Sequence, residues 1–360
     1  MKMDQMLRRQ LAPAVCMLAV LIVAVPAAGQ NDAEQTRELE DWERVELQGL
    51  VQVVVAARRG ELTPTADPFE LTPSYLKGAD GNTYVPFTLT IDPAKLSESN
   101  VAVYVHVIEH QAASAAAETD DSDESETPEA VLPEAIFEDA YFIQAEEGDD
   151  GAAHVSRAFS VPSGDYDVYV ALRDSRGADA DDDARATPTV VLMLKEELSV
   201  PNLWTTDLQT SSVLIAEVIE PLSAPLSPQE QIEQPYTLGT TRIVPKHDRS
   251  FGKRDELSLI MLVYNPTLTA NQMPDVTVEY NFHSKTDSGE EFFNKTNPQQ
   301  FNAQSLPPGF SVELGHQIVA GQSVPLNLFP AGDYRLEILT MDNEAGTSVT
   351  QNVNFTVRET

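Results

Sequence analysis

Cysteine is almost absent from this chain of 360 residues. The one cysteine, Cys16, lies in an apolar segment near the N-terminus that we expect to be removed on export. The mature chain would then contain no cysteine at all. This excludes disulfides, thiol catalysis and thiolate metal sites, so we expect the apolar cores alone to stabilise the protein.

Residues 1–29 have the form of a secretory signal peptide. A short basic start precedes the uncharged stretch Leu11–Ala28, and small residues fit a cleavage site before Gln30. Retention as a membrane anchor is the alternative, although a span needs about 20 apolar residues and this stretch contains two prolines. A lipoprotein is disfavoured because Val15 precedes Cys16, where a small residue is expected. We therefore predict export to the periplasm or exterior of a Gram-negative-type bacterium, with no stable membrane span after cleavage.

Basic residues are also scarce. The chain has 23 lysines and arginines against 57 aspartates and glutamates, a net charge of −34. Such a surface repels nucleic acid and anionic membranes, so we predict no nucleic-acid partner. The acidity suits cations, basic partners, simple solubility or a saline habitat, and the sequence leaves these alternatives open.

Motifs of several enzyme classes are missing as well. The chain has no Gly-x-Ser-x-Gly nucleophile turn and no glycine-rich phosphate loop before a helix. A glycosidase needs only two suitably spaced carboxylates, and among so many acids such a pair can be neither found nor excluded. The sequence therefore predicts no catalytic residue.

One short motif occurs twice, at Pro162–Asp174 and Pro330–Asp342. Each copy reads Pro-x-Gly-Asp-Tyr, followed by alternating apolar positions and a final Asp. Gly-Asp favours a turn, and the alternation predicts a strand with one face on a core. The motif is thus expected to form the same turn and strand in two domains.

Four residues of the repeated motif are predicted to have structural roles. Gly164 and Gly332 supply the turns. Tyr166 and Tyr334 stand at the start of a late strand, where immunoglobulin-like folds place the tyrosine corner.

The strand pattern predicts an all-β protein with two tandem Ig-like or fibronectin-III-like β-sandwiches of about seven strands each. Residues 41–59 fit either a helix or a strand, and we favour a helix. The expected divisions are a signal peptide at 1–29, an N-terminal segment with one possible helix at 30–66, a first sandwich at 67–200 with a disordered acidic insertion near 111–132, a connector with one strand at 201–235, and a second sandwich at 236–360.

Several stretches resemble a known group of proteins: ADGNTYVPFTLTID, VPNLWTTDLQTSSVLIAE, YTLGTTRIVPKHDRSFGKRDELSLIMLVYNP and FPAGDYRLEILTMDNEAGTSVTQNVNFTV. They are similar to uncharacterised secreted proteins of acidobacterial type. The C-terminal half is similar to the sandwich that accompanies Gly-Trp-x-Thr-Asp domains, although that domain itself is absent and Leu203 replaces its glycine before Trp204. The resemblance implies export and an Ig-like fold, and it brings no catalytic residues.

His106-Val-Ile-Glu-His110 matches the H-x-x-E-H pattern of inverted zinc proteases. That chemistry needs both histidines on one face of a helix, one turn apart, with the glutamate as base, whereas this pattern ends a strongly β-type run. In a strand the two side chains would lie about 13 Å apart, too far for one zinc ion. We therefore expect two exposed strand histidines.

Asp179, Asp181 and Asp183 have the alternating carboxylate spacing of calcium loops. Ala184 and Val190 stand where an EF-hand needs glycine and glutamate, so this is no EF-hand. The three aspartates are a weak calcium candidate, and calcium is the one cofactor that the sequence suggests. The alternative is a solvated acidic loop.

The sequence does not identify a function. We expect a non-enzymatic binding or structural module of the bacterial envelope with a protein or glycan partner. The alternatives are an accessory subunit or carboxylate-dependent hydrolase acting on extracellular polymers, and a calcium-dependent envelope spacer. A polar pocket with paired carboxylates of raised pKa would favour the hydrolase.

Overall fold

The computed structural model describes residues 39–110, 132–178, 180 and 189–359. The predicted signal peptide and nearly all of the predicted acidic insertion lie outside the described residues. So do the calcium candidates Asp179, Asp181 and Asp183.

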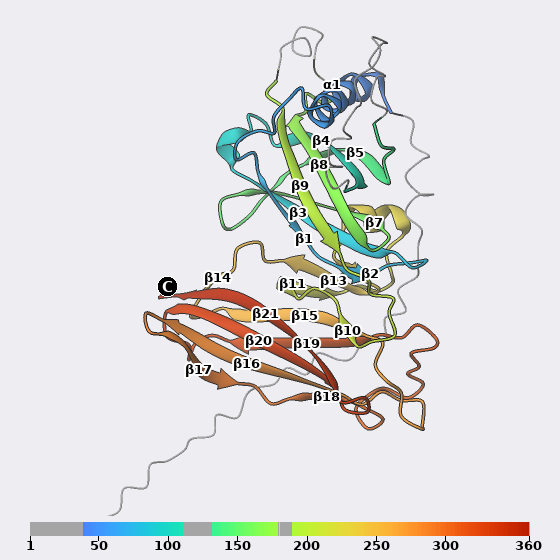
Figure 1. The fold of residues 1–360 in the computed structure, drawn as a ribbon. Coiled ribbons are helices and arrows are strands. Elements are labelled where there is room, and N and C mark those ends of the chain that lie inside the picture. Colours follow the sequence, from blue (N-terminus) through green and yellow to red (C-terminus); the bar gives the residue numbers. More distant parts are fainter. Residues whose placement is uncertain (1–38, 111–131, 179, 181–188, 360) are drawn as a thin grey trace, which may run out of the picture.

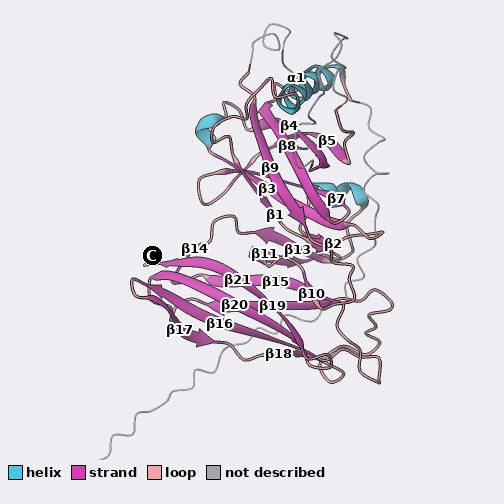
Figure 2. Cartoon of the chain, in the orientation of Figure 1, coloured by secondary structure: helices cyan, strands magenta, loops and turns pink. Residues whose placement is uncertain are grey.

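The described chain stacks in five layers, one helix and four β-sheets, as Figure 1 shows from top to bottom. Strands dominate the chain, and Figure 2 shows the few helices at its margins. An apolar cluster fills each of the four spaces between layers. The fold is all-β and Ig-like, as the strand pattern predicted.

The first sandwich consists of sheets A and B. Sheet A has the order β1-β3-β7-β6 with β2 beside β3, and sheet B has the order β5-β4-β8-β9. Their elements are α1 (Asp41–Arg58), β1 (Glu70–Pro73), β2 (Leu76–Lys77), β3 (Thr83–Ile91), the 3₁₀ turn η2 (Pro93–Lys95), β4 (Asn100–Glu109), β5 (Phe137–Gln144), β6 (Glu146–Glu147), β7 (Ala153–Val161), β8 (Gly164–Asp174) and β9 (Leu192–Val200).

The second sandwich consists of sheets C and D. Sheet C has the order β10-β15-β11-β13-β12 with β19 beside β15, and sheet D has the order β14-β21-β20-β16-β17 with β18 beside β16. Their elements are β10 (Gln209–Thr210), β11 (Leu214–Pro221), α3 (Pro228–Glu233), β12 (Thr237–Leu238), β13 (Thr241–Pro245), β14 (Ser250–Gly252), β15 (Glu256–Tyr264), β16 (Val276–Thr286), β17 (Gly289–Lys295), β18 (Gln299–Phe301), β19 (Ile318–Pro325), β20 (Gly332–Asp342) and β21 (Thr347–Arg358).

Helix α1 covers the outer face of sheet B. A capping box between Glu40 and Glu43 closes its first turn, because each side chain accepts the other's backbone N–H. Leu50 and Val54 then pack on β4 and β8 and are almost fully buried. Residues 41–58 are therefore helical because the sheet offers an apolar face to the valine-rich side of the helix.

The two sandwiches meet through the outer faces of sheets A and C. Ten buried residues, mostly leucine, isoleucine and tyrosine, form a separate apolar cluster there. Tyr75 and Ser212 exchange two hydrogen bonds across the contact, both 2.9 Å long. The Tyr264 hydroxyl accepts a hydrogen bond from the Lys77 amide. The contact is apolar and hydrogen-bonded, which joins the sandwiches firmly.

The two repeated tyrosines make the same hydrogen bond. Tyr166 donates to the Pro162 carbonyl at 2.9 Å, and Tyr334 donates to the Pro330 carbonyl at 2.8 Å. Both rings are buried between the sheets of their own sandwich. This is the geometry of a tyrosine corner.

Two features differ from the sequence-based prediction for residues 201–235. This stretch supplies β10 and β11 to sheet C, so it belongs to the second sandwich and does not merely connect two domains. It also contains the short helix α3, whereas the predicted connector had one strand and no helix. Ser227 caps this short helix, and Ile232 packs into the core of the first sandwich.

Candidate functional site

A cleft opens where the first sandwich meets the second. Its volume is about 530 Å³, within the range of small-ligand pockets. One wall is the outer face of β1 and β3, and the other is formed by the start of β11, the turn after β13 and the middle of β21. Neither sandwich could form this cleft alone.

Residues with hydroxyl and amide side chains are the largest group in the lining of the cleft. Alternation along β1 and β3 places the polar residues of these strands on the outer face, while their apolar partners fill the core. Gln351 donates to the Ser211 carbonyl, and its Oε1 atom is buried without a partner in the described chain. The hydroxyl and amide residues of the lining are Thr72, Ser74, Thr88, Thr90, Ser212, Tyr236, Gln351 and Asn352.

The turn after β13 brings positive charge into the cleft. Lys246 pairs with Asp248 at 2.7 Å, and its ammonium lies 5.3 Å from the centre of the Phe251 ring. Arg249 is exposed, lines the cleft and forms no ion pair with the described residues. A free guanidinium in a chain of charge −34 is suited to an anionic group on a ligand.

Two stacked histidines join the sandwiches, and one of them, His247, also lines the cleft. The rings of His154 on β7 and His247 are 3.8 Å apart and nearly parallel. The Nε2 atom of His154 lies 3.0 Å from the Asp150 carboxylate. Burial, followed by the charge of His154, lowers the pKa of His247 to about 4. Burial alone would raise the pKa of Asp150, but hydrogen bonds from His154 and the Ala152 amide lower it.

Glu70 is the one carboxylate in the described lining of the cleft. A second acid, Glu196 on β9, has its pKa raised by burial and then by the charge of Glu70. Glu196 does not line the cleft. The two acids therefore do not face a common ligand, as a glycosidase pair would have to do.

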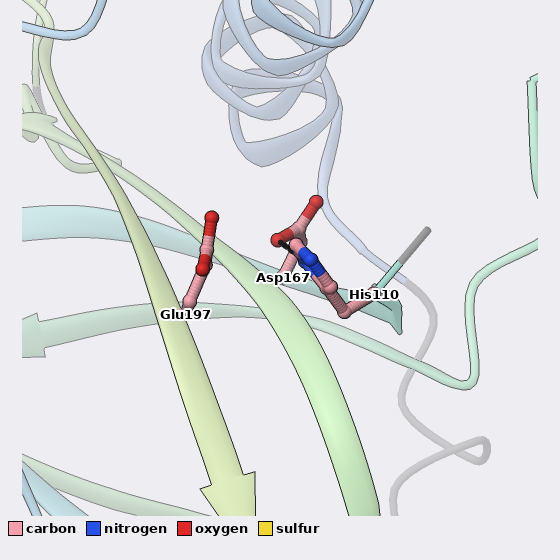
Figure 3. Close-up of side chains that lie close together, drawn as sticks. All are labelled: His110, Asp167 and Glu197. Carbon is pink, nitrogen blue, oxygen red and sulfur yellow. Dashed lines mark hydrogen bonds and ion pairs between the residues drawn. The ribbon is translucent and has the colours of Figure 1, made fainter. Parts of the chain in front are cut away.

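His110, Asp167 and Glu197 gather on the outer face of sheet B (Figure 3). Asp167 and Glu197 are directly opposite each other on β8 and β9, so both side chains project from the same face. His110 follows β4, and its Nδ1 atom lies 2.8 Å from Asp167 Oδ1. This hydrogen bond is the main reason that the pKa of His110 is raised. Lys195 pairs with the other Asp167 oxygen at 3.1 Å.

His106 is separate from this group and is buried, so the expectation of two exposed strand histidines was wrong for this residue. His110 is half-buried and follows the last residue of β4, so the expectation was not met there either. The Arg58 side chain of α1 donates to the Nε2 atom of His106 at 2.7 Å. Tyr104 donates to Glu138 at 2.8 Å and lies 3.1 Å from His106 Nδ1. Burial, followed by the charge of Arg58, lowers the pKa of His106. The sequence missed this burial because nothing local shows that α1 covers the strand.

The sequence did not predict the cleft either. Its walls come from segments about 280 residues apart in the chain, from β1 to β21. The one available signal was Lys246–Arg249, which brings two cations and a histidine together in an acidic chain. The four residues with predicted structural roles, Gly164, Tyr166, Gly332 and Tyr334, do not line the cleft.

No family model matches the chain, and no curated protein matches it. Among solved structures, it is similar to an immunoglobulin-like protein of Pseudomonas aeruginosa, with 13% identity, a TM-score of 0.20, and coverage of 41% of this chain and 97% of the other. A Salmonella alpha-2-macroglobulin mutant has 11% identity and a TM-score of 0.19, with 82% of this chain and 17% of the other covered. Red sea bream transglutaminase has 7% identity and a TM-score of 0.22, with 85% and 33% covered.

None of the helices in the described ranges is both long enough and apolar enough to cross a membrane.

Proposed function

We propose that this protein is a non-enzymatic binding module and that the cleft between its sandwiches holds a saccharide bearing a carboxylate. The observation that carries the proposal is the cleft itself, about 530 Å³ of space whose largest group of lining residues has hydroxyl and amide side chains, with an arginine at its wall that forms no ion pair with the described residues. Pockets at domain interfaces with convergent polar groups are common ligand sites.

A saccharide matches the lining because sugar hydroxyls both donate and accept hydrogen bonds. Serine and threonine hydroxyls do the same, and amide side chains offer both functions at once. Gln351 and Asn352 both line the cleft, and their amide groups can pair with ligand hydroxyls.

The carboxylate of the ligand is assigned to Arg249. Its guanidinium fork fits a carboxylate with two parallel hydrogen bonds. Lys246 lies in the same turn but is already paired with Asp248, so Arg249 is the stronger candidate. The ligand would be an acidic polysaccharide of the cell envelope or its surroundings.

Hydrolysis is the alternative function, and the lining of the cleft gives it less support. Glycoside hydrolysis requires two carboxylates flanking one bond, and the described lining has only Glu70. The raised pKa of Glu196 arises outside the lining.

Export and family remain part of the proposal. We propose that residues 1–29 are a cleaved signal peptide and that the protein acts in the periplasm or outside the cell. We also propose relatedness to secreted proteins of acidobacterial type. N-terminal sequencing of the protein secreted by its native host should begin at Gln30; a start at Met1 would contradict the cleavage.

The binding proposal is tested by titrating the purified protein with oligosaccharides, half of them neutral and half containing uronic acids. We expect the uronic acids to bind, and Arg249→Ala and Gln351→Ala to weaken that binding by about tenfold or more, because each removes a hydrogen-bonding group from a partly buried site. Calorimetry measures both affinities.

Arg242→Ala is the matched control. Arg242 is another arginine of the second sandwich, paired with Glu220 outside the cleft, and its loss should leave binding unchanged. Equal weakening by Arg242→Ala would contradict the cleft as the site. Release of reducing sugar that stops in Glu70→Gln would show that the protein is a hydrolase.

A further inference from the structure

We propose that His110, Asp167 and Glu197 form a binding site for a divalent transition-metal ion of the zinc type, separate from the cleft. One ligand atom from each of the three residues lies within 4.8 Å of the other two. Figure 3 shows that the three side chains lie together over the outer face of sheet B.

The backbone of sheet B holds the ligands in place. Asp167 and Glu197 are opposed across two hydrogen-bonded strands, and the His110 amide donates to the Asp165 carbonyl on the same strand as Asp167. Three neighbouring chain segments thus supply one ligand each. Sites built on strands keep their geometry better than sites built on mobile loops.

Asp167 is already oriented for a metal ion. Its carboxylate is buried, with only 7% of the residue exposed. Lys195 holds the Oδ2 atom at 3.1 Å, while the Oδ1 atom faces His110 Nδ1 at 2.8 Å. A metal ion would replace the proton between Oδ1 and Nδ1 and leave the lysine on the far oxygen. Hydrogen bonds to the second oxygen of a ligating carboxylate are typical of metal sites.

The donor set indicates the class of ion. One imidazole nitrogen and two carboxylate oxygens suit zinc and its neighbours, whereas calcium takes six to eight oxygens. Zinc–ligand bonds are about 2.0–2.2 Å long, which places the ligand atoms of a tetrahedral site about 3.3–3.6 Å apart. Asp167 Oδ1 and His110 Nδ1, which are 2.8 Å apart, would separate slightly, and the exposed Glu197 would approach by a change of rotamer. Three protein ligands leave a fourth position for water or an exogenous ligand atom.

The net negative charge of the protein favours the same ion. The chain has 34 more negative than positive charges, which raises the local concentration of cations near its surface. The site also differs from the stacked histidines, whose rings lie face to face at 3.8 Å, with His154 hydrogen-bonded to Asp150.

The test is calorimetric titration of the purified protein, prepared without a histidine tag and stripped with a chelator, with zinc chloride at pH 7. We expect one strong site per chain. His110→Ala and Glu197→Gln should each weaken it by about tenfold or more. X-ray absorption at the zinc edge should show nitrogen and oxygen ligands including one imidazole.

His247→Ala is the matched control, because it removes a histidine from the other cluster. It should leave the zinc affinity unchanged. The proposal is overturned if the unmodified protein binds no zinc, if the His110 and Glu197 variants bind as tightly as the unmodified protein, or if His247→Ala abolishes binding. Glu197→Gln preserves the shape of an exposed side chain, so misfolding would not explain its effect.

Discussion

The two sandwiches carry the same turn-and-strand motif but bury it differently. In the first, β8 is buried continuously from Tyr166 to Leu172, because α1 covers the outer face of its sheet. In the second, β20 alternates between buried and half-buried positions from Tyr334 to Asp342. The outer face of β20 has no helix packed on it among the described elements.

The difference shows what an added layer does to a common strand. The outer-face residues Tyr169 and Ala171 of β8 correspond to Glu337 and Leu339 in β20. A sheet covered on both faces favours apolar residues at most positions, and one covered on a single face favours them at alternate positions. The same motif can therefore form a strand in a sheet covered on both faces or in a sheet covered on one face. The elements that pack on the strand decide which of the two it is.

Replacing an apolar residue between α1 and sheet B should lower the free energy of unfolding more than any other substitution considered below. Leu50→Ala leaves a cavity between α1 and sheet B and should lower the free energy of unfolding by about 2–5 kcal/mol. Leu339→Ala, on the outer face of β20, should cost less than about 1 kcal/mol. Urea denaturation measures both. Equal losses would show that the outer face of β20 is covered as well.

The second-largest difference in stability is expected between alanine variants of the two motif glycines, Gly332 and Gly164. Gly332 has a φ of +152°, a region that side-chain-bearing residues rarely adopt, while Gly164 lies outside the positive-φ region. Gly332→Ala should therefore cost about 1–3 kcal/mol. Gly164→Ala should cost less, because its Cβ would meet the Tyr166 ring at an ordinary 3.5 Å. Thermal denaturation measures the loss of stability in each variant. A larger loss for Gly164→Ala than for Gly332→Ala would contradict the claim that Gly332 is the conformationally constrained position.

The contact between the sandwiches should weaken in acid because of His247. Its folded pKa is about 4 and its unfolded pKa is about 6.5, so between these values the unfolded chain holds the proton and the folded chain does not. Stability is thus lost as the pH falls from about 6.5 to 4. Allowing for screening at a partly exposed group, we expect about 1–2 kcal/mol.

His247→Gln should remove that part of the pH dependence. Urea denaturation at pH 7, 5.5 and 4.5 gives the free energy of unfolding of the variant and of the unmodified protein. The contribution of the many carboxylates is common to both proteins and cancels in the difference. The groups facing His247 are His154, Asp150, Asp248 and Lys246, and this substitution keeps all four residues. Parallel pH curves for the two proteins would rule out His247 as the source.

The smallest effect is expected where the sandwiches are most alike. Tyr166→Phe and Tyr334→Phe each remove one hydrogen bond to a proline carbonyl, and each should cost about 0.5–1.5 kcal/mol. The two losses should agree within about 0.5 kcal/mol, since the bonds differ by only 0.1 Å. Differential scanning calorimetry measures them. A clearly unequal pair would show that the two corners contribute differently.

Much of the fold could be predicted from the sequence because strands are encoded locally. Alternation in the repeated motif predicts its strands, and short polar turns separate them. The helical choice for residues 41–58 depended on a weak pattern, and the two strands within residues 201–235 were only partly predicted. A strand's pattern shows that it has a buried face without showing which sheet it joins.

The candidate sites could not be predicted in the same way. His106 and His110 lie four residues apart in the chain. His106 is buried and hydrogen-bonded to Arg58 of α1, whereas His110 lies beside Asp167 and Glu197. The distinction depends on which elements pack over each position. Tertiary contacts set burial and charge, and these in turn set the chemistry of a histidine.

The sequence by itself determined that this protein is acidic, poor in cysteine and built from two β-sandwiches with a shared turn, because composition and period-two patterning are local properties. Only the tertiary structure decided that one sandwich is covered by a helix, that Arg249 faces β1 across a cleft, and that three ligand-type residues meet on sheet B. Those features join residues that are distant in the chain, and the packing of sheet on sheet places them.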